Sequence, residues 1–143
     1  MHQRKLAIPP GFEWDYFSPG QGCYLFTYKC FKITTLICYD AEFSETVRHV
    51  AAQGADLVLV PTALGTDWDW AGEKMMPTRA FENGVFFAYA NGVGTQDGIT
   101  FLSKSVIVGR QEQNWHAQAM IQKFYTRLLI CLWSQKHRRG CRI

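Results

Sequence analysis

The chain has 143 residues, of which 48% are hydrophobic and 19% are charged, and its formal net charge is +3. These values are ordinary for a soluble globular domain with a hydrophobic core. No apolar run approaches the roughly 18 residues that a membrane span needs. Residues 1–11 also lack the apolar stretch of a secretory signal. We therefore expect a cytoplasmic protein without a membrane partner.

The charge is unevenly distributed along the chain. Residues 1–113 contain 9 Lys and Arg against 12 Asp and Glu, a net charge of −3. Residues 114–143 contain 6 Lys and Arg and no acidic residue, a net charge of +6. Because the basic character belongs wholly to the second segment, we treat 1–113 and 114–143 as separate units.

The cysteines do not form a recognisable metal site. They include no CxxC pair and no Cys/His cluster at ligand spacing, and an odd number in an intracellular chain favours free thiols over a disulfide framework. Without further context, a buried and inert thiol is the commoner role for any one of them. The five are Cys23, Cys30, Cys38, Cys131 and Cys141.

The predicted elements alternate between strands and helices after a loop rich in proline and glycine. In chain order they are a loop over 1–22, two strand runs ending with Phe31–Cys38, an amphipathic helix over 43–53, a buried strand over 55–61, a helical segment over 71–83 that Pro77 interrupts or delays, and strands over 85–91 and 103–109. Gly54 and Gly84 stand where helix C-caps are expected. This order predicts an α/β layer structure with a largely buried sheet.

A cysteine stands at the end of a buried strand, a few residues before a helix. A strand–turn–helix junction of this kind lifts a side chain out of the sheet, as Leu36-Ile37-Cys38-Tyr39-Asp40 would do for Cys38. The adjacent main-chain N–H groups and helix N-terminus favour a thiolate and the oxyanion of a tetrahedral intermediate. Taken alone, the position suits a structural thiol as well as a nucleophile.

Several blocks around Cys38 follow a known pattern in the same order. ICYDAEFSE is similar to a Cys-(Tyr/Trp)-(Asp/Glu)-x-x-Phe-Pro-Glu signature, Arg4-Lys5-Leu6 to a lysine segment, and Glu13 to a glutamate eight residues later. VLVPTA and TRAFENGVFFAYANGVG are similar to two downstream blocks. Together, over residues 4–109, they resemble the nitrilase superfamily of carbon–nitrogen hydrolases, and most closely its aliphatic or stereoselective amidases.

The resemblance implies a fold and a mechanism. The fold would be an incomplete αββα sandwich of the carbon–nitrogen hydrolase type, in the α/β class. Cys38 would attack a small amide or nitrile and form a thioester acyl-enzyme, without a cofactor. Lys5 and the backbone N–H of Tyr39 would stabilise the oxyanion, and Glu13 would orient Lys5 or the attacking water. Outside this resemblance, Lys5 is more typical of a solvated loop lysine, and Glu13 is as typical of an exposed loop carboxylate as of a site residue.

Two further pairs of residues lie close to the predicted site. Trp68 and Trp70 follow the VLVP strand, at the edge where an α/β sheet binds its ligand, so they are candidates for a substrate-binding wall. Aromatic residues in a loop also pack without binding anything. Arg79 and Glu82, three residues apart, are expected to pair on one helix face and to brace the sheet.

The sequence departs from the family in ways that leave several functions open. The family's general-base glutamate precedes its lysine segment, and no residue of this chain is assigned that role. The resemblance therefore implies a C-terminal half, truncated at its N-terminus, with one sheet face uncovered and no activity as an isolated chain. The alternatives are a catalytically dead fragment with an interaction role or none, a nitrile-hydrolysing member, and a binding module whose basic tail contacts nucleic acid or acidic membrane. The tail lacks a base-stacking pattern, so we expect no nucleic-acid partner. A homo-oligomer is the default expectation.

We predict a one-base insertion or deletion in the gene after codon 113, relative to the genes of its relatives. Codons chosen for the residues from Asn114 onward can, in a shifted register, encode LARAGDDTEVLYAVVDLSLVAEA, which resembles the C-terminal strand and helix of the family. A shift would explain why the tail contains no acid. Sequencing the gene tests this, and stop codons in the shifted frame within its first twenty positions would contradict it.

Overall fold

The computed structural model describes residues 2–109 and 114–116, which form an α/β structure. No helix within this described part is long and apolar enough to cross a membrane. The elements are α1 (Glu13–Tyr16), β1 (Leu25–Tyr28), β2 (Phe31–Thr35), the 3-10 helix η1 (Cys38–Glu42), α2 (Ser44–Ala52), β3 (Leu57–Thr62), the 3-10 helix η2 (Thr66–Trp68), the π-helical turn η3 (Ala71–Met75), α3 (Met76–Asn83), β4 (Phe86–Asn91), β5 (Thr95–Gln96), β6 (Ile99–Thr100), β7 (Val106–Val108) and β8 (Asn114–His116).

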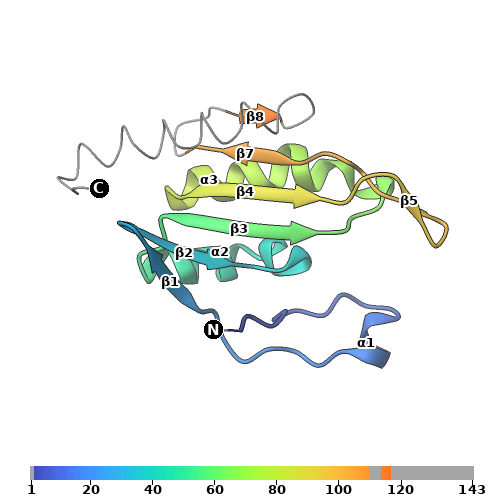
Figure 1. Ribbon diagram of the computed structural model, residues 1–143, viewed down its shortest axis with the longest axis horizontal. Coiled ribbons are helices and arrows are strands. Elements are labelled where there is room, and N and C mark those ends of the chain that lie inside the picture. Colours follow the sequence, from blue (N-terminus) through green and yellow to red (C-terminus); the bar gives the residue numbers. More distant parts are fainter. Residues whose placement is uncertain (1, 110–113, 117–143) are drawn as a thin grey trace.

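One six-stranded sheet organises the molecule, in the order β1-β2-β3-β4-β7-β8. The strands β2, β3 and β4 are parallel, whereas β1, β7 and β8 run antiparallel to their neighbours. In Figure 1 the arrowheads of β3 and β4 point toward the side that also carries the β5–β6 hairpin and the loop with α1. The carboxyl ends of the parallel strands, where α/β proteins place their sites, therefore face these loops.

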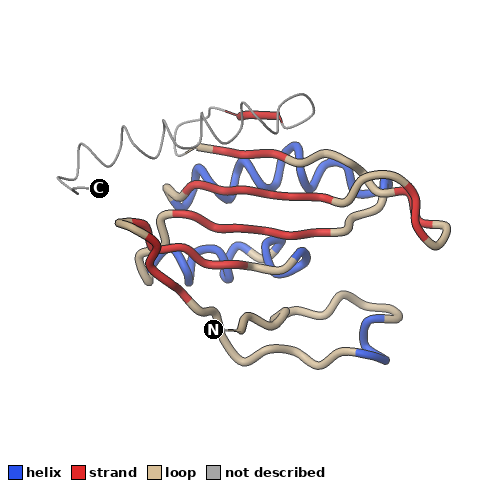
Figure 2. Tube along the Cα trace, in the orientation of Figure 1, coloured by secondary structure: helices blue, strands red, loops and turns tan. Residues whose placement is uncertain are grey.

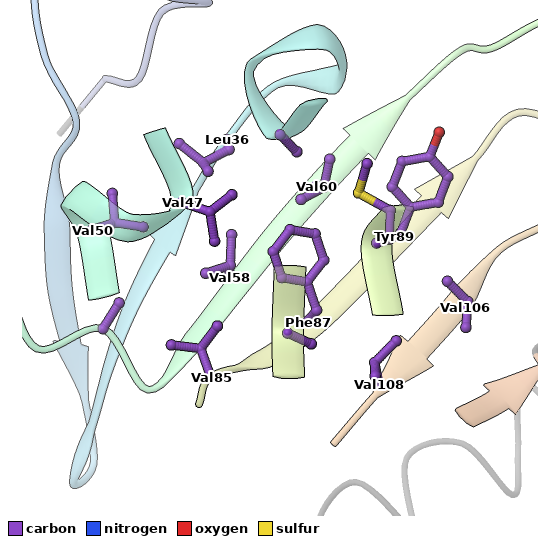
Figure 3. Packing of buried hydrophobic residues seen from close by; sticks show 14 residues of the cluster. Leu36, Val47, Val50, Val58, Val60, Val85, Phe87, Tyr89, Val106 and Val108 are labelled. Atoms are coloured by element: carbon purple, nitrogen blue, oxygen red, sulfur yellow. The ribbon is translucent and has the colours of Figure 1, made fainter. Parts of the chain in front are cut away.

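The main core lies between the sheet and the two longer helices. Figure 2 shows α2 and α3 on the same face of the sheet. Alternate residues of the strands point to that face, so Val58 and Val60 of β3 and Phe87 of β4 pack against Val47 and the rest of the helical side. Figure 3 shows these side chains interdigitating, with Phe87 near the centre of the cluster. The helices are thus held to the sheet by apolar burial rather than by polar contacts.

The opposite face of the sheet carries a second, smaller cluster. Ile33, Leu57 and Phe86 point to this face and are 8%, 5% and 4% exposed. The sequence predicted an uncovered face; both α2 and α3 lie on the other face, and these three side chains are nevertheless buried. Along the edge strand β1, Phe26 and Tyr28 remain exposed, and Phe26 is paired with Ile33 in the register.

Most of the predicted elements are confirmed, and their ends follow local chemistry. Gly84 ends α3 in a left-handed conformation with φ 60°, which glycine adopts without steric cost. Pro77 lies in the first turn of α3, so the predicted segment 71–83 divides into a π-helical turn and a helix. The predicted loop 1–22 contains one helical turn, α1. Of the tail 114–143, only β8 lies within the described residues.

Candidate active site

Cys38 begins the 3-10 helix η1 and has a positive φ of 50°. Strand β2 ends at Thr35, and Leu36 still donates its N–H to the Leu59 carbonyl of β3 (2.9 Å). The chain therefore leaves the sheet between Leu36 and Cys38, and the predicted strand ends three residues earlier than expected. A non-glycine residue in the left-handed region is strained, and such strain persists only when surrounding contacts hold it.

A buried carboxylate provides those contacts. Asp40 is fully buried, and its Oδ2 accepts a hydrogen bond from the N–H of Ile37 (3.0 Å). Its Oδ1 accepts two more, from the N–H groups of Leu6 and Ala7 (both 2.8 Å). These donors are 34 and 33 residues away in sequence. Asp40 thus fixes the turn before Cys38 and joins it to the segment that carries Lys5.

Lys5 and Glu13 form the shortest ion pair of this region, with Nζ and Oε2 2.6 Å apart. Their side chains are 15% and 23% exposed, so the pair is largely removed from water. Gly20 donates its N–H to the Lys5 carbonyl (2.6 Å), and a Cβ at Gly20 would lie 3.0 Å from the Arg4 carbonyl oxygen. This close approach explains the glycine, and it holds the two arms of the N-terminal loop together.

Arg79 of α3 braces the other end of η1. Its Nη2 donates a hydrogen bond to the Glu42 carbonyl (2.9 Å), and its Nη1 lies 3.1 Å from Glu82 Oε1. The predicted Arg79–Glu82 ion pair is therefore confirmed. It braces the cysteine turn, however, rather than the sheet itself. The contact fixes the main chain of Glu42 one helical turn after Cys38.

Two ionisable groups with shifted pKa values lie beside Cys38. Burial raises the pKa of the Glu42 carboxyl above its usual range, and the nearby positive charge of Lys5 partly opposes this shift. Burial also raises the pKa of Tyr89 to about 12, with negative charge at Cys38 and Glu42 adding to the shift. Figure 3 shows the Tyr89 hydroxyl pointing away from the rest of the apolar cluster. The charge of Lys5 thus acts on Glu42, and the charges of Glu42 and Cys38 act on Tyr89.

Tyr39 and the two predicted tryptophans have aromatic partners. The Tyr39 ring packs edge-on against Phe43 with centroids 5.0 Å apart, which fixes the residue after Cys38. The Trp68 and Trp70 rings lie 6.3 Å apart and are 50% and 46% exposed. Their loop follows β3, as predicted. Lys104 forms ion pairs with Asp69 in this loop and with Glu73 just after it.

The loop after β3 is tied to the end of β4 by a buried asparagine. Asn91 Oδ1 accepts a hydrogen bond from the N–H of Leu64 (2.8 Å), and its Nδ2 donates to the Leu64 carbonyl (3.4 Å). Gly92 donates its N–H to the Thr62 carbonyl, and the Phe101 ring lies over it, where a Cβ would come within 3.1 Å. These contacts set the position of the segment that carries Trp68 and Trp70.

The other described cysteines differ from Cys38. Burial and the charge of Asp40 raise the pKa of the Cys23 thiol, which disfavours its reactive thiolate. Cys23 and Cys38 are free thiols, as expected, whereas Cys30 is disulfide-bonded, so the expectation of free thiols is wrong for Cys30. Over the ranges 2–109 and 114–116, no three His, Cys, Asp or Glu side chains are arranged to hold a metal ion.

The Carbon-nitrogen hydrolase family matches residues 2–112 of the chain. The chain belongs to that family. It is 37% identical over 105 residues to the "Hydrolase in pqqF 5′ region" of Pseudomonas protegens, covering 73% of this chain and 37% of that protein. It is 36% identical over 125 residues to the N-carbamoylputrescine amidase of Solanum tuberosum, covering 74% and 42%.

Solved structures of this family have the same fold. A mutant of the Nesterenkonia AN1 amidase from the nitrilase superfamily matches with a TM-score of 0.77 and 39% identity, over 80% of this chain and 44% of that one. Another mutant of that amidase, 41% identical with a TM-score of 0.75, covers 43% of its chain and carries the acetamide moiety of fluoroacetamide on its active-site cysteine. The chain therefore spans less than half the length of these carbon–nitrogen hydrolases.

The structure brings together part of the predicted site and adds residues that the sequence did not indicate. Lys5 and Glu13 are in contact, and Asp40 links their segment to the turn with Cys38 and Tyr39. The roles of Asp40, Glu42 and Tyr89 were missed. A signal was present for two of them: Asp40 matches the Asp/Glu position of the ICYDAEFSE signature, and Tyr89 carries a hydroxyl in the otherwise apolar stretch VFFAYA.

We predict that Asp40→Asn lowers the free energy of unfolding by about 2–3 kcal/mol, because the new amide would turn an N–H toward one of the three N–H donors. Amide hydrogen exchange at Leu6 and Ala7 should speed up, and alkylation of Cys38 should slow. The matched control is Asp56→Asn, at the amino end of β3, where Asp56 accepts from the Lys32 N–H. Equal effects of the two variants on Cys38 would contradict this role for Asp40.

A second prediction concerns alkaline stability. The Tyr89 hydroxyl ionises near 10.0 when unfolded and near 12 when folded, so stability should fall as pH rises from 10 to 12. The expected loss is on the order of 1–2 kcal/mol. Denaturant unfolding at several pH values should show a smaller loss for Tyr89→Phe than for the unchanged chain. Parallel curves for the two proteins would contradict the shift.

Proposed function

We propose that this chain carries the nucleophile and the oxyanion-stabilising cation of an amide hydrolase. The observation that carries the proposal is the connection from Cys38 through Asp40 to the Lys5–Glu13 ion pair. A strained cysteine turn and a paired, largely buried lysine are held to each other by one carboxylate. Structural packing alone does not require a lysine in that place.

The reaction would begin at Cys38. Its sulfur attacks the amide carbon, and the carbonyl oxygen becomes an oxyanion, stabilised by the Lys5 ammonium and the Tyr39 N–H. The C–N bond then breaks, and ammonia leaves after its nitrogen gains a proton. Water hydrolyses the thioester, releasing a carboxylate and restoring the thiol. Glu13 would orient Lys5, as their 2.6 Å contact supports.

Names of relatives support a small amide as the substrate class. One amidase mutant is bound to butyramide, and another carries an acetamide moiety on its active-site cysteine. Trp68 and Trp70, half exposed on the loop after β3, would form one wall of the substrate site. A nitrile is the alternative substrate, since a Pyrococcus abyssi relative named nitrilase is 36% identical over 96 residues.

Proton transfer is the step for which the family pattern assigns no residue in this sequence. A positioned general base commonly contributes about 10²–10⁴-fold. A polypeptide consisting of residues 1–143 alone should therefore form a covalent adduct but turn over slowly or not at all.

We predict that Cys38 is alkylated faster than the other cysteines at neutral pH, while ammonia release from acetamide and from acetonitrile stays at background. The measurement is timed labelling with iodoacetamide after reduction, with peptide mass analysis, beside the ammonia assay. Cys23 is the internal control, because its raised pKa should slow its labelling. Uniform labelling of all cysteines would contradict the proposed nucleophile. Ammonia release abolished by Cys38→Ala would confirm the nucleophile and show that a residue of this chain supplies the base.

A further inference from the structure

We propose that the Glu42 carboxylate selects substrates that carry a positively charged group beside the scissile amide. This inference rests on the proposed function, because it assigns Glu42 to the same site as Cys38. Glu42 lies outside the set of nucleophile, lysine and lysine-paired glutamate. Its proposed role is to recognise charge on the substrate, not to take part in bond breaking.

The main-chain position of Glu42 supports this role. Glu42 is the last residue of η1, which Cys38 begins, so about one helical turn separates the two residues. The Arg79 Nη2 hydrogen bond to its carbonyl fixes the backbone at this point. The side chain is half-buried, and its charge acts on Tyr89, as the charge of Cys38 does. A ligand held at the sulfur of Cys38 would therefore lie in the field of the Glu42 carboxylate.

The charges around Cys38 do not balance without a ligand. Lys5 is paired with Glu13, Arg79 and the exposed Arg48 are paired with Glu82, and the Asp40 carboxylate accepts from three N–H donors. Tyr89 is neutral up to about pH 12. Within the described part of the chain, no hydrogen bond or ion pair reaches the Glu42 carboxylate. Its negative charge is thus the one beside the thiol that lacks a direct partner, although the Lys5 charge acts on it from nearby.

A substrate ammonium is the ligand that best removes this imbalance. Burial raises the pKa of Glu42, which means that the ionised form lacks part of the hydration it would have in water. A cation at the site would restore that stabilisation, whereas an anionic substrate would add a second negative charge. The rival role is acceptance of the Cys38 proton. It would raise the reactivity of the sulfur toward every reagent equally.

Two maleimides of matched reactivity separate these roles, because the Cys38 thiolate adds to the same double bond in each and the adjacent carbon takes up a proton. N-(2-aminoethyl)maleimide is cationic at neutral pH, and N-ethylmaleimide is neutral and almost the same size. The measured quantity is the rate constant of the cationic maleimide at Cys38 divided by that of the neutral one. We expect this ratio to fall about three- to tenfold in Glu42→Gln. Added salt should reduce the ratio in the unchanged chain more than in the variant.

Matched variants exclude indirect causes. Glu45→Gln removes an equal charge from an exposed residue three positions along, and it should leave the ratio unchanged. Glu42→Asp keeps the charge and should retain most of the preference. Glu42→Gln should unfold at the same temperature as the unchanged chain or higher at neutral pH, since it removes a carboxylate that burial disfavours when ionised.

Three outcomes would overturn the inference. If Glu42→Gln slows both maleimides by the same factor, Glu42 is a proton acceptor and not a charge selector. If Glu45→Gln changes the ratio as much, the effect is the general surface field. If Cys38 reacts with neither reagent, or no faster than Cys23, the site does not admit a ligand and the proposed nucleophile fails with it. A reactive Cys38 with an unchanged ratio rejects the Glu42 inference alone.

Discussion

The rest of the site depends on the Asp40 carboxylate and the three N–H groups that bind it. A buried charge without partners is strongly destabilising, so the carboxylate is stable only while Ile37, Leu6 and Ala7 donate to it. Two of these donors belong to a segment that has no strand or long helix of its own. The hydrogen bonds that the buried Asp40 carboxylate requires therefore determine where that segment lies, and with it the position of Lys5. A lysine distant in sequence is brought to the cysteine turn by a residue that takes no part in the proposed chemistry.

The strained backbone at Cys38 is held in place from three directions. Asp40 fixes the turn before the cysteine, the Arg79 guanidinium fixes the carbonyl at the far end of η1, and the fully buried Leu36 anchors the strand side. A positive φ at a non-glycine residue costs on the order of 1–3 kcal/mol, which a single hydrogen bond would not offset. The apolar packing of α2 and α3 on the sheet supplies the remainder. Core and site are thus energetically connected, because α3 contributes both Met76 to the core and Arg79 to the turn.

The fold was largely predictable from sequence because its signals are local. The continuous apolar runs of β3 and β4, the apolar spacing of α2 and the glycine after α3 each indicate an element without knowledge of its neighbours. The site was predictable only where a family pattern supplied the connection, as it did for Lys5, Glu13 and Cys38. The Asp40 contacts with Leu6 and Ala7 join residues more than thirty positions apart, and no periodicity reports such a contact. The exposed turn α1 was also missed, since proline and glycine around it predict a loop.

Glu42 carries a carboxylate that forms no ion pair or hydrogen bond within the described residues, and such a group is explained by function better than by stability. Every other acid around the cysteine turn has a partner: Glu13 has Lys5, Glu82 has Arg79, and Asp40 has three N–H groups. Selection for stability alone would favour a glutamine at position 42, because an amide loses less hydration on burial than a carboxylate does. Burial, to which the charges of Cys38 and Glu42 add, raises the pKa of Tyr89 to about 12, so no second negative charge appears there at neutral pH. This single negative charge lies about one turn from the thiol and has no ion-pair partner among the residues that the structure describes, so it attracts a cation and repels an anion. The partners of the other acids stabilise the fold, whereas a Glu42 carboxylate with no partner among the described residues would give the site a preference for cationic substrates.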